Sequence, residues 1–359
     1  MRYHLGAMAV AGALVVSAAL GGASCARAAT AAPEQPARIV VGPTLAANLD
    51  TPWGIAFLPD GSALIGERDT AVVRRIPAKG GKARAVGKVA HVTPFGEGGL
   101  LGLAVPPGPD PRFVFAYITT AQDNRVVRLA WDGSRLGAQR AILTGIPRAD
   151  HHDGGRLLVG ADRTLFVSTG DASVSARAQD RSSLAGKVLH ITFDGAPAPG
   201  NPFRASPVYT LGHRNVQGLA LDSRGRVWAS EFGEKDVDEL NLLRPGGNYG
   251  WPVHEGASDD PGYVNPVTQW SPTATASPSG LAIVGDVAYV ASLRGETLYR
   301  VPLTGPRAGQ AGRVDVGDRG RLRSIALAPD GSLWLVTGNT DGRGSPRPED
   351  DKVLRLSMR

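Results

Sequence analysis

One phrase recurs six times along the chain and limits the possible folds more than any other feature. With some drift, each copy begins Gly-φ-Ala-φ, where φ is a large apolar residue, continues through a short polar turn and ends in a second apolar run. An apolar strand, a turn built on Asp-Gly or a similar pair, and a returning strand are typical of a β-hairpin. The copies open at Gly54, Gly102, Gly155, Gly218, Gly280 and Ser324.

The segments between the copies hold further strand candidates. The copies start 48, 53, 63, 62 and 44 residues apart, which leaves room for two more strands after each hairpin. Repeats of about 40–50 residues with four strands each are typical of propeller blades. We therefore predict an all-β fold, a six-bladed β-propeller of four-stranded antiparallel blades. A β-sandwich also uses many short strands, but it does not predict one opening phrase six times. The additional strands are expected at Val72–Ile76, Arg125–Trp131, Lys187–Phe193 and Thr297–Pro302.

The two longest spacings predict insertions on one face of the ring. They follow Gly155 and Gly218 and place the insertions at Asp171–Gly186 and Pro252–Pro278. Loops on one face of a rigid scaffold commonly carry the binding site. The 47 glycines and 27 prolines fit a chain with many tight turns.

The first residues predict an exported protein. An uncharged run, Leu5–Ala19, follows Arg2, which indicates a signal peptide over residues 1–28 and a propeller domain over residues 38–359. A cut before Cys25 would leave a lipid anchor, as in bacterial lipoproteins, whereas an ordinary Ala-x-Ala cut just after it would discard that cysteine. We expect the protein to be periplasmic, extracellular or lipid-anchored on the outer face of the cell membrane.

Cysteine content and charge exclude several classes of protein. Cys25 is the single cysteine, so the mature fold has neither disulfides nor cysteine–metal chemistry. The formal net charge is +6 at pH 7, and the basic residues do not gather in a block. This pattern disfavours nucleic-acid binding.

Two adjacent histidines precede a glycine-rich turn in the segment HHDGGRL, which starts at His151. Imidazoles on a loop are candidate general bases because their protonation changes near neutral pH. The strand predicted at Thr164–Thr169 runs back toward this loop and brings Asp171 near it. A carboxylate beside an imidazole can orient the ring, so His152 and Asp171 form a candidate base and orienting acid.

Four arginines lie near the expected blade ends. Arg214 belongs to the phrase GHRNVQGL before the fourth copy and can donate to a carboxylate or a carbonyl oxygen; alternatively, it satisfies buried backbone carbonyls between blades. Arg321 and Arg323 are two residues apart in an extended segment and therefore face one side, and Arg294 lies in a similar turn. If these blade ends converge at one mouth of the ring, the four side chains form a positively charged funnel for an anion. The alternative is that they serve surface solubility.

Five carboxylates lie within the nine residues 231–239 and precede the run GGNYGWP, which starts at Gly246. Such a set favours Ca²⁺, which takes oxygen ligands and often the main-chain carbonyls of glycine-containing turns. The sequence lacks the twelve-residue helix–loop–helix calcium pattern, so a solvated acidic loop is the alternative. The sequence has no dinucleotide fingerprint, phosphate loop, serine nucleophile elbow or zinc-protease motif.

These phrases together resemble the soluble quinoprotein glucose/sorbosone dehydrogenases, also called aldose sugar dehydrogenases. The resemblance covers nearly the whole chain from Leu49 onward. It is carried by GEGGLLGLA, HHDGGRL, SLAGKVLHI, GHRNVQGL and DELNLLRPGGNYGWP. It implies a six-bladed propeller, in agreement with the repeats, and the cofactor pyrroloquinoline quinone (PQQ), a tricarboxylate held with Ca²⁺ at the propeller mouth.

The resemblance also implies catalytic roles. His152 matches the general base that takes the proton of the sugar's anomeric hydroxyl while a hydride passes to the quinone, and Asp171 matches the carboxylate that orients this base. Arg214 and Asn215 match residues that contact the quinone oxygens and ring. An arginine there would stabilise the charge that develops on reduction.

Further contacts to the cofactor and the metal follow from the same resemblance. The main-chain carbonyls of Gly233 and Glu234 match the calcium ligands, although Glu234 stands where a proline is common. Trp270 is the candidate aromatic that stacks on the quinone, and Gln179 is a candidate polar contact. The cationic contacts to the PQQ carboxylates match Arg294, which stands where a lysine occurs, Arg321 and Arg323.

We therefore expect PQQ-dependent oxidation of aldose sugars at the anomeric carbon to lactones, with an unidentified electron acceptor. One alternative is a propeller lactonase in which a metal ion polarises an ester carbonyl. A second alternative is a non-catalytic secreted propeller that binds a ligand or partner protein.

Overall fold

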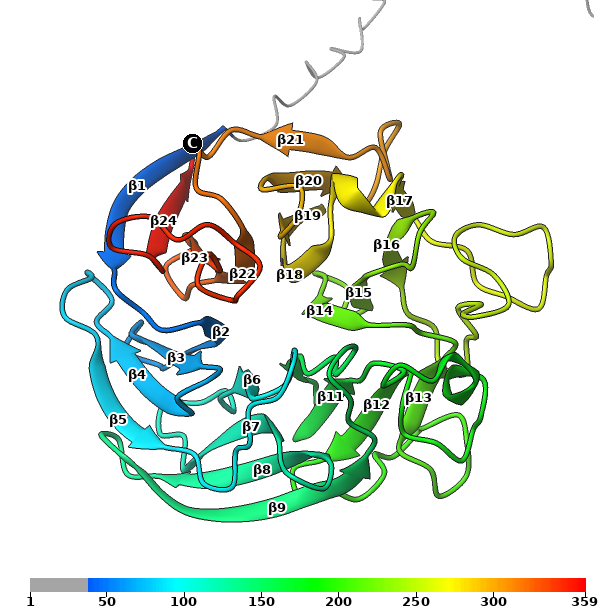
Figure 1. Ribbon diagram of the computed structural model, residues 1–359, viewed down its shortest axis with the longest axis horizontal. Coiled ribbons are helices and arrows are strands. Elements are labelled where there is room, and N and C mark those ends of the chain that lie inside the picture. Colours follow the sequence, from blue (N-terminus) through cyan, green and yellow to red (C-terminus); the bar gives the residue numbers. More distant parts are fainter. Residues whose placement is uncertain (1–37) are drawn as a thin grey trace, which may run out of the picture. The chain divides into compact units, whose positions relative to one another are not determined.

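The protein folds into a ring of six blades around a central axis (Figure 1). The computed structural model describes residues 38–359. The predicted signal peptide, residues 1–28, and Cys25 lie outside the described residues. Within the described residues, no helix is long and apolar enough to cross a membrane.

Each blade is a four-stranded antiparallel sheet, as predicted. In five of them the strands follow one another in chain order. Blade 1 contains β2 (Pro52–Phe57), β3 (Ala63–Glu67), β4 (Val72–Ile76) and β5 (Arg84–Lys88). Blade 2 contains β6 (Leu100–Ala104), β7 (Phe113–Thr119), β8 (Asn124–Trp131) and β9 (Leu136–Ile146). Blade 3 contains β10 (Leu157–Val159), β11 (Thr164–Ser168), β12 (Lys187–Thr192) and β13 (Val208–Leu211).

Blade 4 contains β14 (Val216–Leu221), β15 (Val227–Glu231), β16 (Asp238–Leu242) and β17 (Thr268–Trp270). Blade 5 contains β18 (Pro278–Val284), β19 (Val287–Ser292), β20 (Leu298–Pro302) and β21 (Gly312–Val314). Blade 6 contains β22 (Leu322–Leu327), β23 (Leu333–Thr337), β24 (Val353–Met358) and, at its outer edge, β1 (Ile39–Ala46). Two short 3₁₀ helices span Ser175–Ala178 and Thr273–Thr275.

The six repeated phrases form the two inner strands of the six blades. The first strands of neighbouring blades contact one another all the way around the axis. A Cβ atom added to Gly54 would lie 2.3 Å from the carbonyl oxygen of Leu101 in the next blade, and one added to Gly102 would lie 2.3 Å from that of Gly155. The repeated phrase therefore opens with a glycine because adjacent inner strands approach too closely for a side chain.

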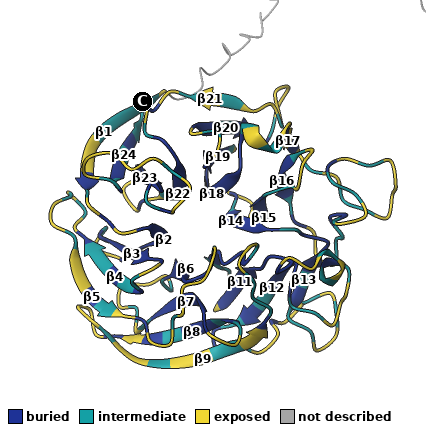
Figure 2. Cartoon of the chain, in the orientation of Figure 1, coloured by how far each residue is buried: buried dark blue, intermediate teal, exposed yellow. Residues whose placement is uncertain are grey.

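Burial decreases from the axis to the rim. The inner strands are almost fully buried, whereas the outer strands β5 and β9 expose many residues (Figure 2). The hydrophobic clusters lie largely between neighbouring blades; one joins Ile55 and Ile65 of blade 1 to Trp334 and Val336 of blade 6. The ring thus has no single central core, and its axis is left open to polar side chains.

Two features of the fold differ from the sequence prediction or were missed by it. The predicted insertion 252–278 extends too far, because it contains β17 and the start of β18. Strand β17 has only three residues, which is too short to show an alternating pattern. Strand β1 was not predicted either; it pairs with β24 and closes the ring by joining the start of the described chain to its end.

Candidate active site

A cavity of about 510 Å³ opens at one mouth of the ring. Most of its lining comes from around the start of the first strand of a blade or from just after the second strand, and these segments share one end of the propeller. The prediction that distant loops meet at one mouth is therefore confirmed. Among the described residues, six arginines and four carboxylates line this cavity: Arg68, Arg214, Arg294, Arg321, Arg323 and Arg343, with Glu97, Glu234, Asp238 and Asp341.

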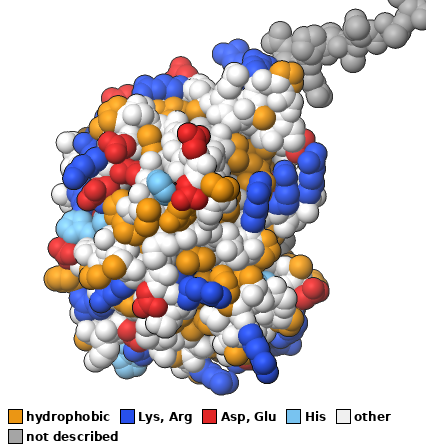
Figure 3. Space-filling view, turned by 90° about the vertical axis from the view of Figure 1, so that its right-hand side faces the viewer, with side chains coloured by type: hydrophobic (Ala, Val, Ile, Leu, Met, Phe, Trp, Pro, Cys, Tyr) orange, Lys and Arg blue, Asp and Glu red, His pale blue; other side chains and the backbone are white. Residues whose placement is uncertain are grey.

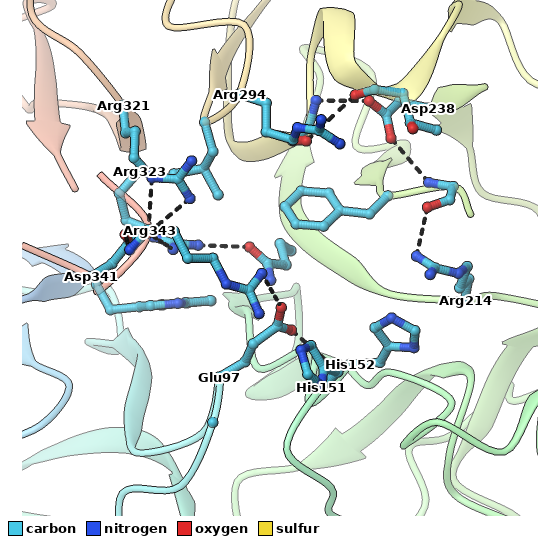
Figure 4. A pocket seen from close by; sticks show the side chains of 18 of the residues that line it. Glu97, His151, His152, Arg214, Asp238, Arg294, Arg321, Arg323, Asp341 and Arg343 are labelled. Atoms are coloured by element: carbon cyan, nitrogen blue, oxygen red, sulfur yellow. Dashed lines mark hydrogen bonds and ion pairs between the residues drawn. The ribbon is translucent and has the colours of Figure 1, made fainter. Parts of the chain in front are cut away.

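His152 lies on one side of this cavity (Figure 4). Its ring contacts Asp171. Its Nδ1 atom is 2.7 Å from Oδ1 of Asp171, so the predicted proximity of the two residues is confirmed. Because the carboxylate accepts a hydrogen bond, the neutral imidazole carries its proton on Nδ1 and leaves Nε2 as the acceptor. About 17% of the His152 side chain is exposed. This arrangement suits a general base.

The backbone of His152 is held in an unusual conformation. Its φ angle of 65° lies in the left-handed region, which is costly for a residue with a Cβ atom. Its N–H donates to Oε2 of Glu97 at 2.9 Å, and its carbonyl accepts from the N–H of Ala172 at 3.2 Å. A Cβ atom on Gly170 would lie 1.9 Å from the carbonyl oxygen of His152. The surrounding loops thus fix the position of the imidazole.

Asp171 is almost fully buried, and both of its oxygens accept hydrogen bonds. Oδ1 also accepts from the N–H of Ser173 at 2.8 Å, and Oδ2 accepts from the indole N–H of Trp251 at 2.9 Å. Trp251 follows β16 on the long segment that leads to β17. We call His152, which lines the cavity, and its two supporting residues Asp171 and Trp251, which do not, the histidine wall.

The opposite side of the cavity carries Arg294, Arg321 and Arg323, which we call the arginine wall (Figure 4). Arg321 and Arg323 face the same side, as predicted, and both donate to Oδ2 of Asp341, at 2.9 Å and 3.1 Å. Burial lowers the pKa of Arg323 to about 10. Although burial alone would raise the pKa of Asp341, the neighbouring Arg323 and Arg321 keep it below its ordinary value. One carboxylate thus serves two buried guanidinium groups.

Arg214 lies between the two walls. Its Nη1 donates to the carbonyl oxygen of Gly233 at 2.5 Å, whereas its buried Nε has no hydrogen-bond partner among residues 38–359. The guanidinium carbon is 5.4 Å from the ring centroid of Trp251. An unpaired buried donor is rare in proteins, and here it points to a missing acceptor.

Gly233 and Glu234, the predicted calcium ligands, also line the cavity. Nearby Asp238 accepts the N–H of Gly233 on Oδ1 at 3.0 Å and that of Ser277 on Oδ2 at 2.7 Å. Burial raises the pKa of Asp238 to about 7. The described part of the chain has no group of three or more His, Cys, Asp or Glu side chains placed to hold a metal ion. A cation at this site would therefore need main-chain carbonyls and oxygens from a bound ligand.

Three predicted cofactor contacts do not line the cavity. Asn215 is buried behind it, where its side chain accepts from Gly154 N–H at 3.1 Å and reaches Glu97 at 3.4 Å. Trp270 packs in the core against Tyr299 because β17 is the outer strand of blade 4. Gln179 pairs with Asn248 and with the carbonyl of Trp251. The aromatic residues that do line the cavity are Trp53 and Phe232.

Two acids that organise the cavity, Asp341 and Glu97, were not among the residues predicted from the sequence. Oε1 of Glu97 accepts from Nη1 of Arg343 at 2.9 Å, across a separation of 246 residues. Glu97 belongs to the phrase GEGGLLGLA, where a single acid among glycines and leucines was the available signal. Asp341 lies in a glycine-bounded turn that carries no comparable signal.

Comparisons with known proteins agree with this fold. The solved structure of the PQQ-bound aldose sugar dehydrogenase of Streptomyces coelicolor is 47% identical, with a TM-score of 0.86, and the match covers 90% of this chain and all of that one. Aldose sugar dehydrogenase YliI of Escherichia coli is 27% identical over 84% of this chain and 91% of its own length.

Quinoprotein glucose dehydrogenase B of Acinetobacter calcoaceticus is 31% identical over a shorter match, 60% of this chain and 53% of that protein. The sequence profile described as Glucose / Sorbosone dehydrogenase matches residues 49–347, which is most of the chain. The protein therefore belongs to the glucose/sorbosone dehydrogenase family.

Proposed function

We propose that this protein oxidises aldose sugars at the anomeric carbon to lactones, with PQQ as cofactor. The observation that carries the proposal is the pairing of His152 with Asp171 at the edge of a cavity whose other side is lined by arginines. The family membership and the PQQ-bound relative support it. The electron acceptor and the particular sugar are not specified by this geometry.

The lining residues fit a polyanionic quinone. Six arginines and four carboxylates line the cavity. Burial raises the pKa of Asp238 to about 7, so this carboxyl is partly protonated near pH 7. Arg321, Arg323 and Arg294 would hold the carboxylates of the cofactor, since guanidinium groups bind carboxylates with strong charge-assisted hydrogen bonds. The unpaired Nε of Arg214 would donate to an oxygen of the bound quinone.

Ca²⁺ is part of the same proposal. The carbonyls of Gly233 and Glu234 would bind it together with oxygens of the cofactor, because Ca²⁺ commonly takes main-chain carbonyl ligands. This would give the carbonyl of Gly233 a second partner besides Arg214. A cation there would also lie near the buried carboxylate of Asp238, which accepts the Gly233 N–H.

His152 acts as the general base in this proposal. Its Nε2 accepts the proton of the anomeric hydroxyl, and Asp171, fixed by Trp251 and Ser173, stabilises the imidazolium that forms. The bound quinone supplies the acceptor for the hydride that leaves the anomeric carbon. Loss of one proton and one hydride converts the cyclic aldose to its lactone.

Export is also proposed, on the sequence of the first 28 residues alone. With a signal peptide, the enzyme would work in the periplasm, outside the cell, or anchored through a lipid on Cys25.

Two assays on the purified protein test the function. With PQQ, Ca²⁺ and an artificial electron acceptor, we expect oxidation of aldoses. Lactone hydrolysis with Ca²⁺ alone and no response to PQQ would indicate the lactonase instead. Ligand binding without turnover in either assay would indicate a binding module.

A further inference from the structure

The loop that carries the two proposed calcium ligands is organised around one carboxylate. Oε1 of Glu255 accepts the backbone N–H groups of four consecutive residues, 234–237, at 2.7, 3.0, 3.0 and 3.2 Å. Successive backbone N–H groups that converge in this way form an anion-binding concavity. Hydrogen bonds to an ionised acceptor are among the stronger ones in proteins.

This loop is closed tightly around the carboxylate. A Cβ atom on Gly233 would lie 1.8 Å from the carbonyl oxygen of Val237 and 2.5 Å from Oε1 of Glu255. The N–H of Gly233 itself donates to Asp238 at 3.0 Å. Two carboxylates therefore take the N–H groups of all five residues from 233 to 237. Gly233 and Glu234 of this loop line the cavity.

Glu255 is supplied by an insertion that the ring itself does not require. It lies between β16 and β17, on the segment that projects from the right-hand side of the ring in Figure 1. On that side of the molecule, acidic, basic and apolar groups are interspersed (Figure 3). The next residue, Gly256, donates its N–H to the buried Glu239 at 2.8 Å, which fixes the position of Glu255.

The residue at position 234 makes this arrangement possible. Its N–H makes the shortest of the four bonds to Glu255. A proline at this position would have no N–H to donate and would instead restrict its own φ angle. In this chain the hydrogen bonds to the carboxylate of Glu255 restrict the loop, as the ring of a proline would do.

We propose that Glu255 is a positioning residue that holds the carbonyls of Gly233 and Glu234 in place for the divalent cation. The inference rests on the proposed calcium requirement of the enzyme. It assigns to the insertion a role in assembling the cofactor site. Glu255 acts through the loop backbone and is not itself counted among the calcium ligands.

The test compares the wild type with Glu255→Ala and with the matched control Asp259→Ala, which removes an exposed carboxylate from the same insertion. Amide hydrogen exchange of the protein without PQQ reports on the loop, and Ca²⁺ titration of the protein with PQQ reports on the site. In Glu255→Ala we expect faster exchange at residues 234–237. We also expect Ca²⁺ affinity to fall about 10–100-fold, as for other residues that orient metal ligands. The control should match the wild type in both measurements.

A second variant separates positioning from general loss of structure. Glu234→Pro combined with Glu255→Ala should recover most of the Ca²⁺ affinity, because the proline restricts the loop without the carboxylate. Wild-type Ca²⁺ affinity in Glu255→Ala would overturn the inference but leave the proposed function intact. Failure of the wild type to bind Ca²⁺ in the presence of PQQ would instead overturn the calcium requirement, and the inference with it.

Discussion

The histidine wall and the arginine wall differ in how their charges are balanced. On the histidine wall, Asp171 accepts hydrogen bonds on both oxygens and His152 is fixed through its ring and its backbone. On the arginine wall, Arg321 and Arg323 share Asp341, and Arg294 is exposed at the mouth. A network whose hydrogen bonds are all made holds one geometry. Two buried guanidinium groups that share one carboxylate instead favour binding of a further anion. We therefore propose that the histidine wall carries the chemistry and that the arginine wall binds the cofactor.

The largest effect should come from removing the base. In His152→Ala we expect turnover with a saturating aldose to fall about 10²–10⁴-fold, which is the usual contribution of a general base. PQQ affinity should stay near the wild-type value, because the arginine wall is intact. Steady-state kinetics of the reconstituted enzyme and a PQQ titration measure the two quantities. His91→Ala, at an exposed histidine outside the cavity, is the matched control. Unchanged turnover in His152→Ala would remove the assigned role of this wall.

Removing a buried cation should have the opposite effect, namely weaker PQQ binding with a smaller change in turnover. In Arg323→Ala we expect PQQ affinity to fall by about 1.5–3 kcal/mol, the range for a hydrogen bond to a charged group. Turnover at saturating PQQ should change less. Titration of the protein without cofactor measures the affinity, and Arg313→Ala on the outer strand β21 is the control. A variant that binds PQQ like the wild type but turns over slowly would reverse the assignment of the two walls.

A smaller effect is expected at Trp251. Trp251→Phe removes the N–H donor to Asp171 and keeps an aromatic ring beside Arg214. Leaving a buried acceptor unpaired costs ~1–3 kcal/mol, so turnover should fall about tenfold. The affinity for PQQ should stay near the wild-type value. Trp251→His, which restores a ring N–H, should recover part of the lost turnover; equal turnover in all three proteins would show that the indole donor does not matter.

The smallest effect concerns Glu239, in blade 4 between the two walls. Burial, with the nearby Glu231, raises the pKa of Glu239 to about 8. Since the folded state then holds a proton that the unfolded state has lost, the free energy of unfolding should fall as the pH rises from about 4.5 to 8. Glu239→Gln should weaken this dependence and raise the melting temperature at pH 8 by about 2–4 °C. Thermal melts of the metal-free protein at several pH values measure both, and a wild-type slope in the variant would contradict the raised pKa.

The fold could be predicted because the repeat has a local physical cause. The glycine that opens the phrase is required by the close approach of neighbouring inner strands, so it recurs in nearly every blade. The proximity of His152 and Asp171 was predictable because one hairpin, β10 to β11, joins them. Arg321 and Arg323 could be placed on one side because an extended chain has a period of two.

The rest of the site depends on how the ring closes, which has no local signature. Glu97 and Arg343 meet only because blades 2 and 6, the two neighbours of blade 1, bring their loops together at the mouth. Trp270 was assigned to the quinone, but its place on the outer strand takes it into the core. The aromatic residue that contacts Asp171 is Trp251, in the run GGNYGWP, to which the sequence assigned no role at this site.

The central claim is that the arginine wall binds PQQ next to His152, which then removes the substrate proton. The most direct test follows the quinone absorbance while PQQ and Ca²⁺ are added to the protein, and then after one addition of an aldose. We expect stoichiometric uptake by the wild type and by His152→Ala, with fast reduction by the sugar in the wild type alone. No uptake by the wild type, or equally fast reduction in both proteins, would contradict the claim.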